Sequence, residues 1–278
     1  MGRLHEKQSL TVTGTRKLQL IGLSGVPLVR EADELCEIVS NALANSGEAL
    51  RNGDILVIAQ KIVSKARGRY VDLNTIEPSA HAEDLAKTVE KDPRLIELIL
   101  RESTEVLRVR RDVIIVVHRL GFVMANAGVD FSNVDNRTDV DNKTDVDNNT
   151  EEQRALLLPL DPDAECEQLR RDINKLSGAD IGVVMNDSHG RAWRNGTVGV
   201  AIGASGVETL ADMRGKPDLF GRAFRITQVG VADEIAAAAS LLMGQSDEGM
   251  PLVLMRGLQT GHGKAADLIR PKEIDLFR

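Results

Sequence analysis

Two short polar segments carry residue types that could bind a hard cation and phosphate groups. Segment 126–133 follows an apolar stretch and holds Asp130 together with a hydroxyl and two amides. Segment 186–196, which we expect to form a loop after the apolar stretch 180–185, combines Asp187 and Ser188 with two arginines. Mg²⁺ and Mn²⁺ bind carboxylate and phosphate oxygens, and arginines neutralise the charge of a transferring phosphoryl group. Together, the two segments favour phosphoryl transfer.

None of these residues identifies a site when it is taken singly. An isolated Asp130 or Asp187 is typical of a turn or a helix cap. Lys65 comes soon after an apolar stretch, at a place where ligands commonly bind in open α/β sheets. His189 could move protons, but a loop histidine is more typical of simple hydrogen bonding. Trp193 could stack on a ligand, and we expect it instead in the core.

Two glycine-rich segments fail the usual nucleotide-binding fingerprints. Segment 257–264 resembles a P-loop, but its spacing is one residue too long and Ala265 stands where a magnesium-binding Ser or Thr belongs. The glycines of the second segment lack the dinucleotide spacing, so we expect them in turns and in closely packed strands. These glycines are at positions 196, 199, 203 and 206.

The elements that must position the polar segments follow from apolar periodicity. Helical patterns begin near Glu31, run from Asp92-Pro93 to about Glu102, and cover 232–243. Between them lie apolar stretches of strand length. This interleaving predicts a mixed α/β (α+β) fold and leaves the strand order open. The expected strands are 18–23, 54–59, 112–117, 180–185, 197–203 and 251–255.

The composition narrows the class of protein. A chain of 278 residues with 42% hydrophobic content can form one large domain or two modest ones. It has neither the roughly 20 apolar residues of a membrane span nor a secretory signal, so we expect a cytoplasmic protein without a membrane partner. Aromatic residues make up 3% and no basic stripe occurs, which argues against nucleic acid. Cys36 and Cys166 fall in amphipathic helical patterns, where we expect structural thiols.

One segment cannot contribute to a core. The units VDNRTD, VDNKTD and VDNNTE follow one another from Val134 to Glu151. Residues 134–152 carry seven acidic and two basic residues, a local charge of −5 out of the total of −7. We expect an acidic loop, inserted at 134–150 between structured elements. A cation-binding repeat is the alternative, although it lacks the glycines that such loops use.

Six motifs, in order, resemble the coenzyme F420-0:L-glutamate ligase family over about residues 18–257. They read GVPLV, DILVIAQKIVSKA, NAGVDFSNV, LLLPLDPD, NDSHGRAWRNGTVGVAIGASG and VADEIAAAASLLMGQ. The resemblance implies a GTP-dependent ligase that adds L-glutamate to F420-0, a deazaflavin. It also implies a two-lobed fold specific to the family, an intertwined homodimer, and a need for Mn²⁺ or Mg²⁺ and for K⁺. The ligase domain would span 18–278, after an N-terminal extension at 1–17.

The same resemblance implies roles for single residues. Asp130, Asp187, Ser188 and Gln245 would be metal ligands, and relatives usually carry threonine at the position of Ser188. Asp130, Asp187 and Arg191 would serve catalysis, while Asn126, Ser132 and Arg194 would contact phosphate or substrate. The residues that would hold the guanine nucleotide are Val26, Pro27, Leu28, Val29, Gln60, Lys61, Lys65, Asn133, Leu241, Leu242, Met243, Gly244, Gln245, Ser246, Asp247 and Glu248.

The implied mechanism begins when the carboxylate of the lactyl tail of F420-0 takes the γ-phosphoryl group of GTP. The amine of glutamate then displaces phosphate from the acyl phosphate. Arg67 departs from the family, which usually has glutamate there, so a related ligase for another carboxylate or amino acid stays open. A non-catalytic deazaflavin- or nucleotide-binding protein stays open as well. So does an α/β oxidoreductase, which would need a dinucleotide fingerprint.

Overall fold

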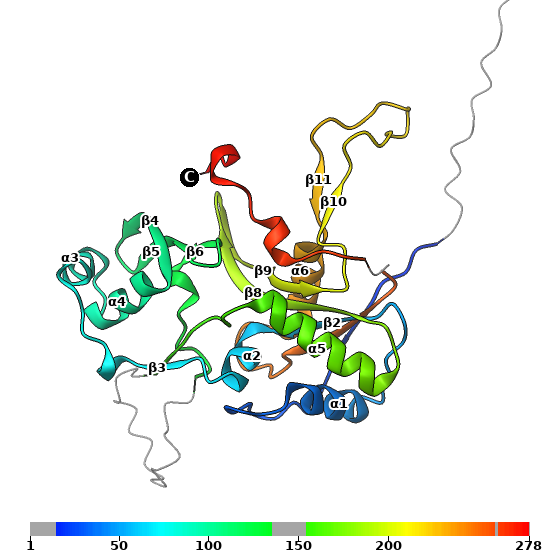
Figure 1. Cartoon of the computed structure of the whole chain (residues 1–278), viewed down its shortest axis with the longest axis horizontal. Coiled ribbons are helices and arrows are strands. Elements are labelled where there is room, and N and C mark those ends of the chain that lie inside the picture. The colour runs from blue at the N-terminus through cyan, green and yellow to red at the C-terminus, as the bar shows by residue number, and fades with distance from the viewer. Residues whose placement is uncertain (1–14, 135–153, 259–260, 278) are drawn as a thin grey trace, which may run out of the picture.

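The structure is a computed structural model that describes residues 15–134, 154–258 and 261–277. Its centre is a mixed five-stranded sheet of order β1-β12-β2-β8-β9 (Figure 1). The strands β2 and β8 are parallel, and the other neighbours are antiparallel. In sheet order, the strands are Gln19–Gly22, Leu252–Arg256, Ile55–Ala59, Gly182–Arg191 and Arg194–Ser205.

Helices cover both faces of this sheet because its strands are apolar on both sides. Successive side chains of a strand point to opposite faces. In β2, Leu56 and Ile58 therefore pack on one face with α1 (Leu35–Asn45) and α5 (Pro162–Ser177). Ile55 and Val57 pack on the other face against α6, at Val231–Met243. The sheet is thus the middle layer of the larger part of the protein.

A smaller sheet forms a separate core beside the first. Its antiparallel order is β4-β5-β6, and α3 and α4 pack on it around Ile96, Ile99 and Ile114. A two-stranded pairing of β3 with β7 connects this region to the larger sheet. The elements are α3 (Ala80–Val89), α4 (Pro93–Arg101), β4 (Ser103–Arg110), β5 (Val113–His118), β6 (Val123–Ala125), β3 (Tyr70–Asp72) and β7 (Arg154–Leu156).

The remaining elements are short. Strands β10 and β11 form an antiparallel arm that projects from the larger sheet (Figure 1). Helix α2 follows β2 directly, and short turns of 3₁₀ helix are the other elements of the described residues. Their bounds are β10 (Leu210–Asp212), β11 (Gln228–Gly230), α2 (Gln60–Ala66), η1 (Leu73–Thr75), η2 (Asn126–Gly128), η3 (Ala265–Leu268) and η4 (Lys272–Ile274).

The mixed α/β class and the six predicted strands are confirmed, and so are the helices α4 and α6. Asp92 caps α4 by accepting the amide N–H of Arg94, and Pro93 occupies its first turn. Helix α1 begins at Leu35 and not near Glu31, because Glu34 is extended and serves as the N-cap. Cys36 lies in α1 and Cys166 in α5; both are free thiols, and burial raises the pKa of each.

Two expectations about segment 186–196 are wrong. The segment is not a loop, because β8 continues to Arg191 and β9 begins at Arg194. Because its side chains are mostly polar, the segment lacks the alternation of apolar and polar residues that predicts a strand. Hydrogen bonds to the partner strand hold it extended. Trp193 is not in the core; it lies at the tip of this hairpin with φ of 65° and 88% exposure.

The glycines of β9 pack closely, as predicted. A Cβ atom added at Gly199 would lie 2.5 Å from the carbonyl oxygen of Ala236 in α6. At Gly203 it would lie 2.4 Å from the carbonyl oxygen of Pro162 in α5. Gly196 and Gly206 have φ of 82° and 72°, which suits turns. Glycine therefore lets helices approach both faces of β9.

Some expectations fall outside the part of the chain that is described. The acidic repeat lies there except for Val134, and so does most of the extension at 1–17. The division into two lobes stays a prediction. Within the described residues, no helix has both the length and the apolar character needed to cross a membrane.

Candidate functional site

The candidate site lies where β2 ends and α2 begins. Ala59 is the last residue of β2 and the N-cap of α2, so the chain changes from strand to helix at Gln60. Ala59 also pairs with Asn186 of the parallel strand β8, which places Asp187 one residue beyond this point. Ligands commonly bind outside the carboxyl ends of parallel strands in such sheets.

Lys61 connects this point to the segment that contains Asp130. Its Nζ atom lies 2.7 Å from Oδ2 of Asp130 and donates to Oγ of Ser132 at 2.6 Å. Asp130 also accepts the amide N–H of Ser132, and its backbone forms an isolated antiparallel bridge with Leu156. Burial raises the pKa of Asp130, but Lys61 and Ser132 outweigh it, so the net shift is downward. Asp130 is therefore ionised at neutral pH.

Hydrogen bonds bring together three of the segments predicted to hold the nucleotide. Lys65 donates from Nζ to the carbonyl oxygen of Asn133 at 2.6 Å. Asn133 donates from Nδ2 to the carbonyl oxygen of Ser246 at 3.1 Å, and the amide of Ser246 donates to Glu248. Lys61 and Lys65 thus lie on one side of α2, beside Asn133 and the segment 246–248.

The fourth predicted segment, Val26 to Val29, shares a core cluster with Ile62, Val63 and Ala66 of α2. The amide of Ala32 donates to the carbonyl oxygen of Ala66 at 2.9 Å, next to the end of α2. Val29 is buried in the core, whereas Leu28 and Pro27 are exposed. The chain that follows this segment therefore reaches the end of α2 that carries Lys65.

Asp187 is paired with His189, two residues further along β8. The His189 Nε2 atom lies 2.9 Å from Oδ2 of Asp187, and Phe122 meets the imidazole edge-on with ring centroids 6.2 Å apart. His189 is therefore a hydrogen-bonding residue, as expected. Ser188 is exposed and points to the opposite face of the strand from Asp187, so these two predicted ligands do not share one face of β8.

Several other predicted residues lie apart from this group within one chain. Arg191 and Arg194 sit at the exposed hairpin tip, where Arg191 donates to the carbonyl of Gly196 at 3.2 Å. Arg191 lies four positions beyond Asp187 along β8, which corresponds to roughly 13 Å. Gln245 is exposed in the loop after α6. Met243 is buried in the core, where its sulfur accepts a hydrogen bond from the side-chain amide of Asn186 at 3.3 Å.

The end of α6 and the loop after it are largely open to solvent. Leu241 and Leu242 are exposed, and Gly244 ends α6 with φ of 71°. Asp247 and Glu248 are exposed as well. The predicted contacts of these residues with a nucleotide stay predictions.

The donor atoms near β2 are of the chemical type that a hard cation accepts. Among the described residues, no three His, Cys, Asp or Glu side chains converge on one point. Asp130 and Asp187 nevertheless both border the end of β2, and each carboxylate is only partly exposed, at 34% and 15%. Carboxylate, hydroxyl and amide oxygens are the ligands that Mg²⁺ and Mn²⁺ accept. Asp130 and Asp187 are therefore the residues that would hold such an ion.

Arg67, the departure from the family motif, makes a structural contact. Its Nε atom lies 3.0 Å and 2.9 Å from the two carboxylate oxygens of Glu165. This pair connects the end of α2 to the first turn of α5. The positive charge of Arg67 is therefore compensated within the chain.

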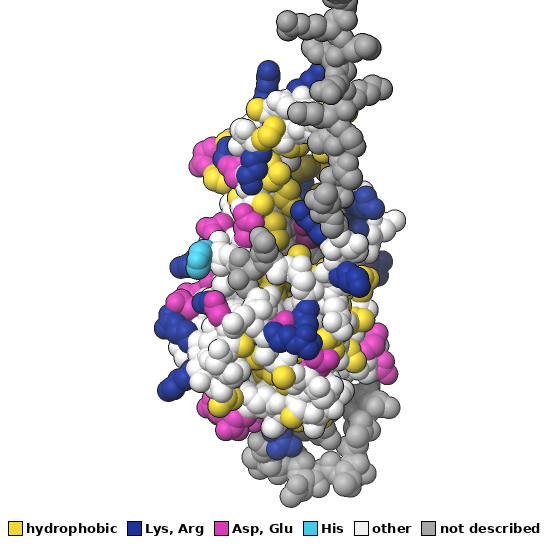
Figure 2. Space-filling model, turned by 90° about the vertical axis from the view of Figure 1, so that its right-hand side faces the viewer, with side chains coloured by type: hydrophobic (Ala, Val, Ile, Leu, Met, Phe, Trp, Pro, Cys, Tyr) yellow, Lys and Arg dark blue, Asp and Glu magenta, His cyan; other side chains and the backbone are white. Residues whose placement is uncertain are grey.

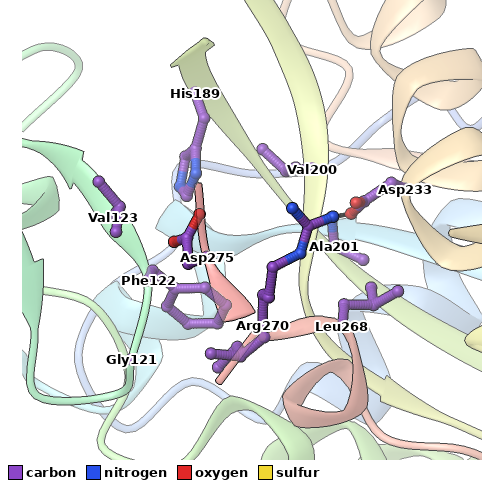
Figure 3. Close-up of a pocket in the computed structure, with 11 residues that line it drawn as sticks. Gly121, Phe122, Val123, His189, Val200, Ala201, Asp233, Leu268, Arg270 and Asp275 are labelled. Atoms are coloured by element: carbon purple, nitrogen blue, oxygen red, sulfur yellow. Dashed lines mark hydrogen bonds between the residues drawn. The ribbon is translucent and has the colours of Figure 1, made fainter. Parts of the chain in front are cut away.

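Sequence reasoning missed a pocket on the far side of His189 (Figure 3). Phe122, Asp233 and Arg270 contribute to its wall from three separate parts of the chain. Asp233 lies in the first turn of α6, where an acidic residue is an ordinary helix feature. No local signal could have linked these residues, because they come together only in the folded chain.

Comparison with known proteins gives consistent matches over nearly the whole chain. Residues 25–257 match the sequence model of a family described as F420-0:Gamma-glutamyl ligase. A protein of Methanothermobacter thermautotrophicus named coenzyme F420:L-glutamate ligase is 44% identical over 265 residues, which cover 94% of this chain and 99% of the relative. A protein of the same name from Methanocaldococcus jannaschii is 40% identical, over 95% of this chain and 98% of the relative. Another, from Methanopyrus kandleri, is 44% identical, over 94% of this chain and 99% of the relative.

Proposed function

We propose that this chain, which belongs to the F420-0:gamma-glutamyl ligase family, joins L-glutamate to coenzyme F420-0 and uses GTP as the co-substrate. The names of the relatives support the two joined substrates. GTP is supported by the grouping of Lys61, Lys65 and Asn133 along one side of α2. This grouping is the observation on which the proposal chiefly rests, because two ammonium groups beside a carboxylate suit a nucleotide phosphate and its cation.

The proposed reaction has two steps. First, a carboxylate oxygen of F420-0 attacks the γ-phosphorus of GTP; the bond from that phosphorus to the β-phosphate oxygen breaks, and GDP leaves. Second, the nitrogen of glutamate attacks the acyl carbon, an amide bond forms, and the bond from carbon to the phosphate oxygen breaks. Overall, the glutamate ammonium loses two protons, one to the departing phosphate and one to solvent. Activation is needed because a free carboxylate resists attack by an amine.

The residues around α2 would act by position and charge. Lys61 and Lys65 would bind phosphate oxygens and offset the charge that accumulates during transfer. Asp130 and Asp187 would hold Mn²⁺ or Mg²⁺, which supplies further charge neutralisation when bound. A K⁺ ion and a cytoplasmic location complete the proposal.

Replacing Lys61 by alanine should lower kcat/KM for GTP by roughly 10- to 100-fold, the usual effect of losing a charged hydrogen bond. The reason is that Lys61 offers an ammonium group next to Asp130. Initial rates of GDP release at varied GTP would measure the loss. Lys87→Ala is the matched control, since this exposed lysine pairs with Asp84 at the surface of α3. Equal kcat/KM in the two variants would contradict the role of Lys61.

We further propose the two-lobed, intertwined homodimer of the family. The sheet of β4, β5 and β6 would belong to the second lobe. The arm between β10 and β11 exposes the apolar side chains Leu219, Phe220 and Ile226. Hydrophobic side chains gather on the upper part of the face in Figure 2, at the height of the arm in Figure 1. Exposed apolar patches of this kind mark interaction surfaces.

A Phe220→Asp variant should elute as a monomer where the unchanged protein elutes as a dimer. Phe220 is 88% exposed in the single chain, and a charge there would oppose burial against a second copy. Light scattering coupled to size-exclusion chromatography measures the mass directly. Asp218→Asn, in the same arm, controls for local effects. A monomeric unchanged protein, or a dimer that tolerates the aspartate, would contradict this arrangement.

One assay tests the reaction as a whole. The purified protein is incubated with F420-0, L-glutamate, GTP, Mn²⁺ and K⁺, and GDP release is followed together with product mass. We expect one GDP for each glutamyl unit gained. Binding without GDP release would favour a non-catalytic deazaflavin- or nucleotide-binding protein. Turnover with another carboxylate or amino acid, but not with these substrates, would favour the related ligase.

A further inference from the structure

A pocket of about 190 Å³ lies beside the pair of Asp187 and His189 (Figure 3). Phe122, from the turn between β5 and β6, forms one side, and His189 and Val200 of the long hairpin form another. The start of α6 contributes Asp233, and the C-terminal segment contributes Arg270. Four parts of the chain thus enclose one space.

The C-terminal segment is held in place as a wall of this pocket. Lys272 donates from Nζ to Oε2 of Glu105 in β4 at 2.6 Å. A Cβ atom added at Gly121 would lie 3.0 Å from Cδ1 of Ile269, so the segment is packed tightly on the turn between β5 and β6. Gly121 has φ of 92°, which favours glycine there.

Opposite charges face each other across the pocket. Figure 3 shows the guanidinium of Arg270 pointing towards the carboxylate of Asp233, with Asp275 on the side of His189. Oδ1 of Asp233 accepts the amide N–H of Ala201 at 2.9 Å, which fixes the direction of the carboxylate. Burial raises the pKa of Asp233, and the Ala201 amide and His189 offset only part of this rise. An added cation would therefore be favourable beside Asp233.

We propose that this pocket binds the L-glutamate co-substrate, with a carboxylate on Arg270 and the ammonium group between Asp233 and Asp275. The assignment rests on the proposed function. A zwitterion has a carboxylate that can accept from Arg270 and an ammonium group that can donate to Asp233, and Arg270 can hold a carboxylate with two parallel hydrogen bonds. The apolar side chains of Phe122 and Val200 can cover the methylene groups.

Size and position favour the amino acid over the other substrates. Pockets for drug-sized ligands measure roughly 300–1,000 Å³, so this smaller pocket suits neither a deazaflavin nor a nucleotide. The pocket is also next to the proposed site of phosphoryl transfer, because His189 lines the pocket and forms a hydrogen bond with Asp187. A bound glutamate would hold its nitrogen near the acyl phosphate, and such positioning contributes strongly to rate.

The test separates glutamate binding from activation of F420-0. Hydroxylamine attacks an acyl phosphate without an amino-acid site, and it yields a hydroxamate and phosphate. With F420-0, GTP and Mg²⁺, the Arg270→Ala variant should form hydroxamate within about 2-fold of the unchanged protein, while its KM for glutamate rises about 10-fold or more. Asp233→Asn keeps the acceptor for Ala201 and removes the charge, so its KM for glutamate should rise as well.

Arg110→Ala is the matched control, because Arg110 is an exposed arginine of β4 that does not line the pocket. Its KM for glutamate should equal that of the unchanged protein. An unchanged KM in both Arg270→Ala and Asp233→Asn would overturn the proposal. Equal losses of hydroxamate and glutamate ligation in both would overturn it too, since the residues would then act on the first step.

Failure of the proposed function has a different signature. The unchanged protein would then form neither hydroxamate nor glutamyl product. Calorimetric titration with L-glutamate still tests the pocket in that case. Binding that is lost in Arg270→Ala and kept in Arg110→Ala would support it, and equal heats in the two variants would overturn it.

Discussion

Replacing Asp130 or Asp187 by alanine will lower glutamate ligation by about 10³-fold and will leave the protein folded. The expected loss is at the upper end for removing one charge-stabilising group from a preorganised site, since a carboxylate that holds the cation acts throughout phosphoryl transfer. The fold should persist because neither carboxylate is fully buried; their exposures are 34% and 15%. GDP release and product mass measure the first effect, and circular dichroism with thermal unfolding measures the second.

Asp84→Ala provides the control for these variants. Asp84 is an exposed aspartate of α3 that pairs with Lys87, and such exposed pairs contribute little to stability because solvent screens them. We expect its ligation rate and thermal midpoint to match those of the unchanged protein. Near-normal turnover in either Asp130→Ala or Asp187→Ala would show that the metal is held elsewhere.

Replacing Glu102 by glutamine will reduce the free energy of unfolding at pH 7 by about 3 kcal/mol, the lower end for breaking a buried ion pair. Oε2 of Glu102 lies 3.0 Å from Arg119 Nε, 3.6 Å from Arg69 Nη2 and 3.6 Å from His118 Nε2. The Glu102 side chain is 11% exposed and His118 is buried. Without the carboxylate, the neighbouring cationic groups would lack their shared anion. Urea unfolding followed by circular dichroism measures the change.

The contribution of Glu102 to the free energy of unfolding should also depend on pH. Burial raises the pKa of Glu102, but His118, Arg119 and Arg69 together lower this pKa by more than burial raises it. The folded-state pKa of Glu102 therefore lies below the unfolded one. The stabilisation is therefore complete above the unfolded pKa of roughly 4.3 and is lost as the pH falls through the folded pKa. The difference between Glu102→Gln and the unchanged protein should shrink in that acidic range. A difference under about 1 kcal/mol at pH 7 would contradict the cluster's contribution.

The Glu90→Gln variant is a control for the loss of an exposed carboxylate. Glu90 is the C-cap of α3 and pairs with Arg111 at 3.0 Å, and the two side chains are 55% and 73% exposed. We expect a loss of roughly 1 kcal/mol, which is typical of hydrogen bonds at exposed sites. The contrast with Glu102 would show that burial, and not charge alone, sets the larger effect.

Much of the secondary structure could be predicted because its signals are local. The apolar stretch 54–59 is long enough for a strand and is followed by a helix, as the structure has it. Asp92 and Pro93 begin α4 because one caps the first turn and the other suits it. The hairpin of β8 and β9 escaped prediction beyond Asn186, because its partly buried face carries the polar residues Asp187 and His189 and so shows no apolar alternation.

The candidate site could be predicted as residue types but not as an arrangement. Asp130 and Lys65 attract notice by their type and by the motif that surrounds each of them. Their neighbours could not be assigned in this way: Lys61 meets Ser132 across 71 positions of sequence, and Asn133 meets Ser246 across 113. The family resemblance supplied these segments as a set, and the hydrogen bonds supplied the contacts.

The sequence by itself determined the mixed α/β class, the apolar strands and helix starts, and the family, because these depend on short stretches and ordered motifs. Only the tertiary structure decided the strand order, the convergence on the end of β2, the exposure of Trp193 and the pocket between Asp233 and Arg270. The physical reason is that local patterns state which side chains must be buried, whereas strand pairing and packing decide which distant side chains meet.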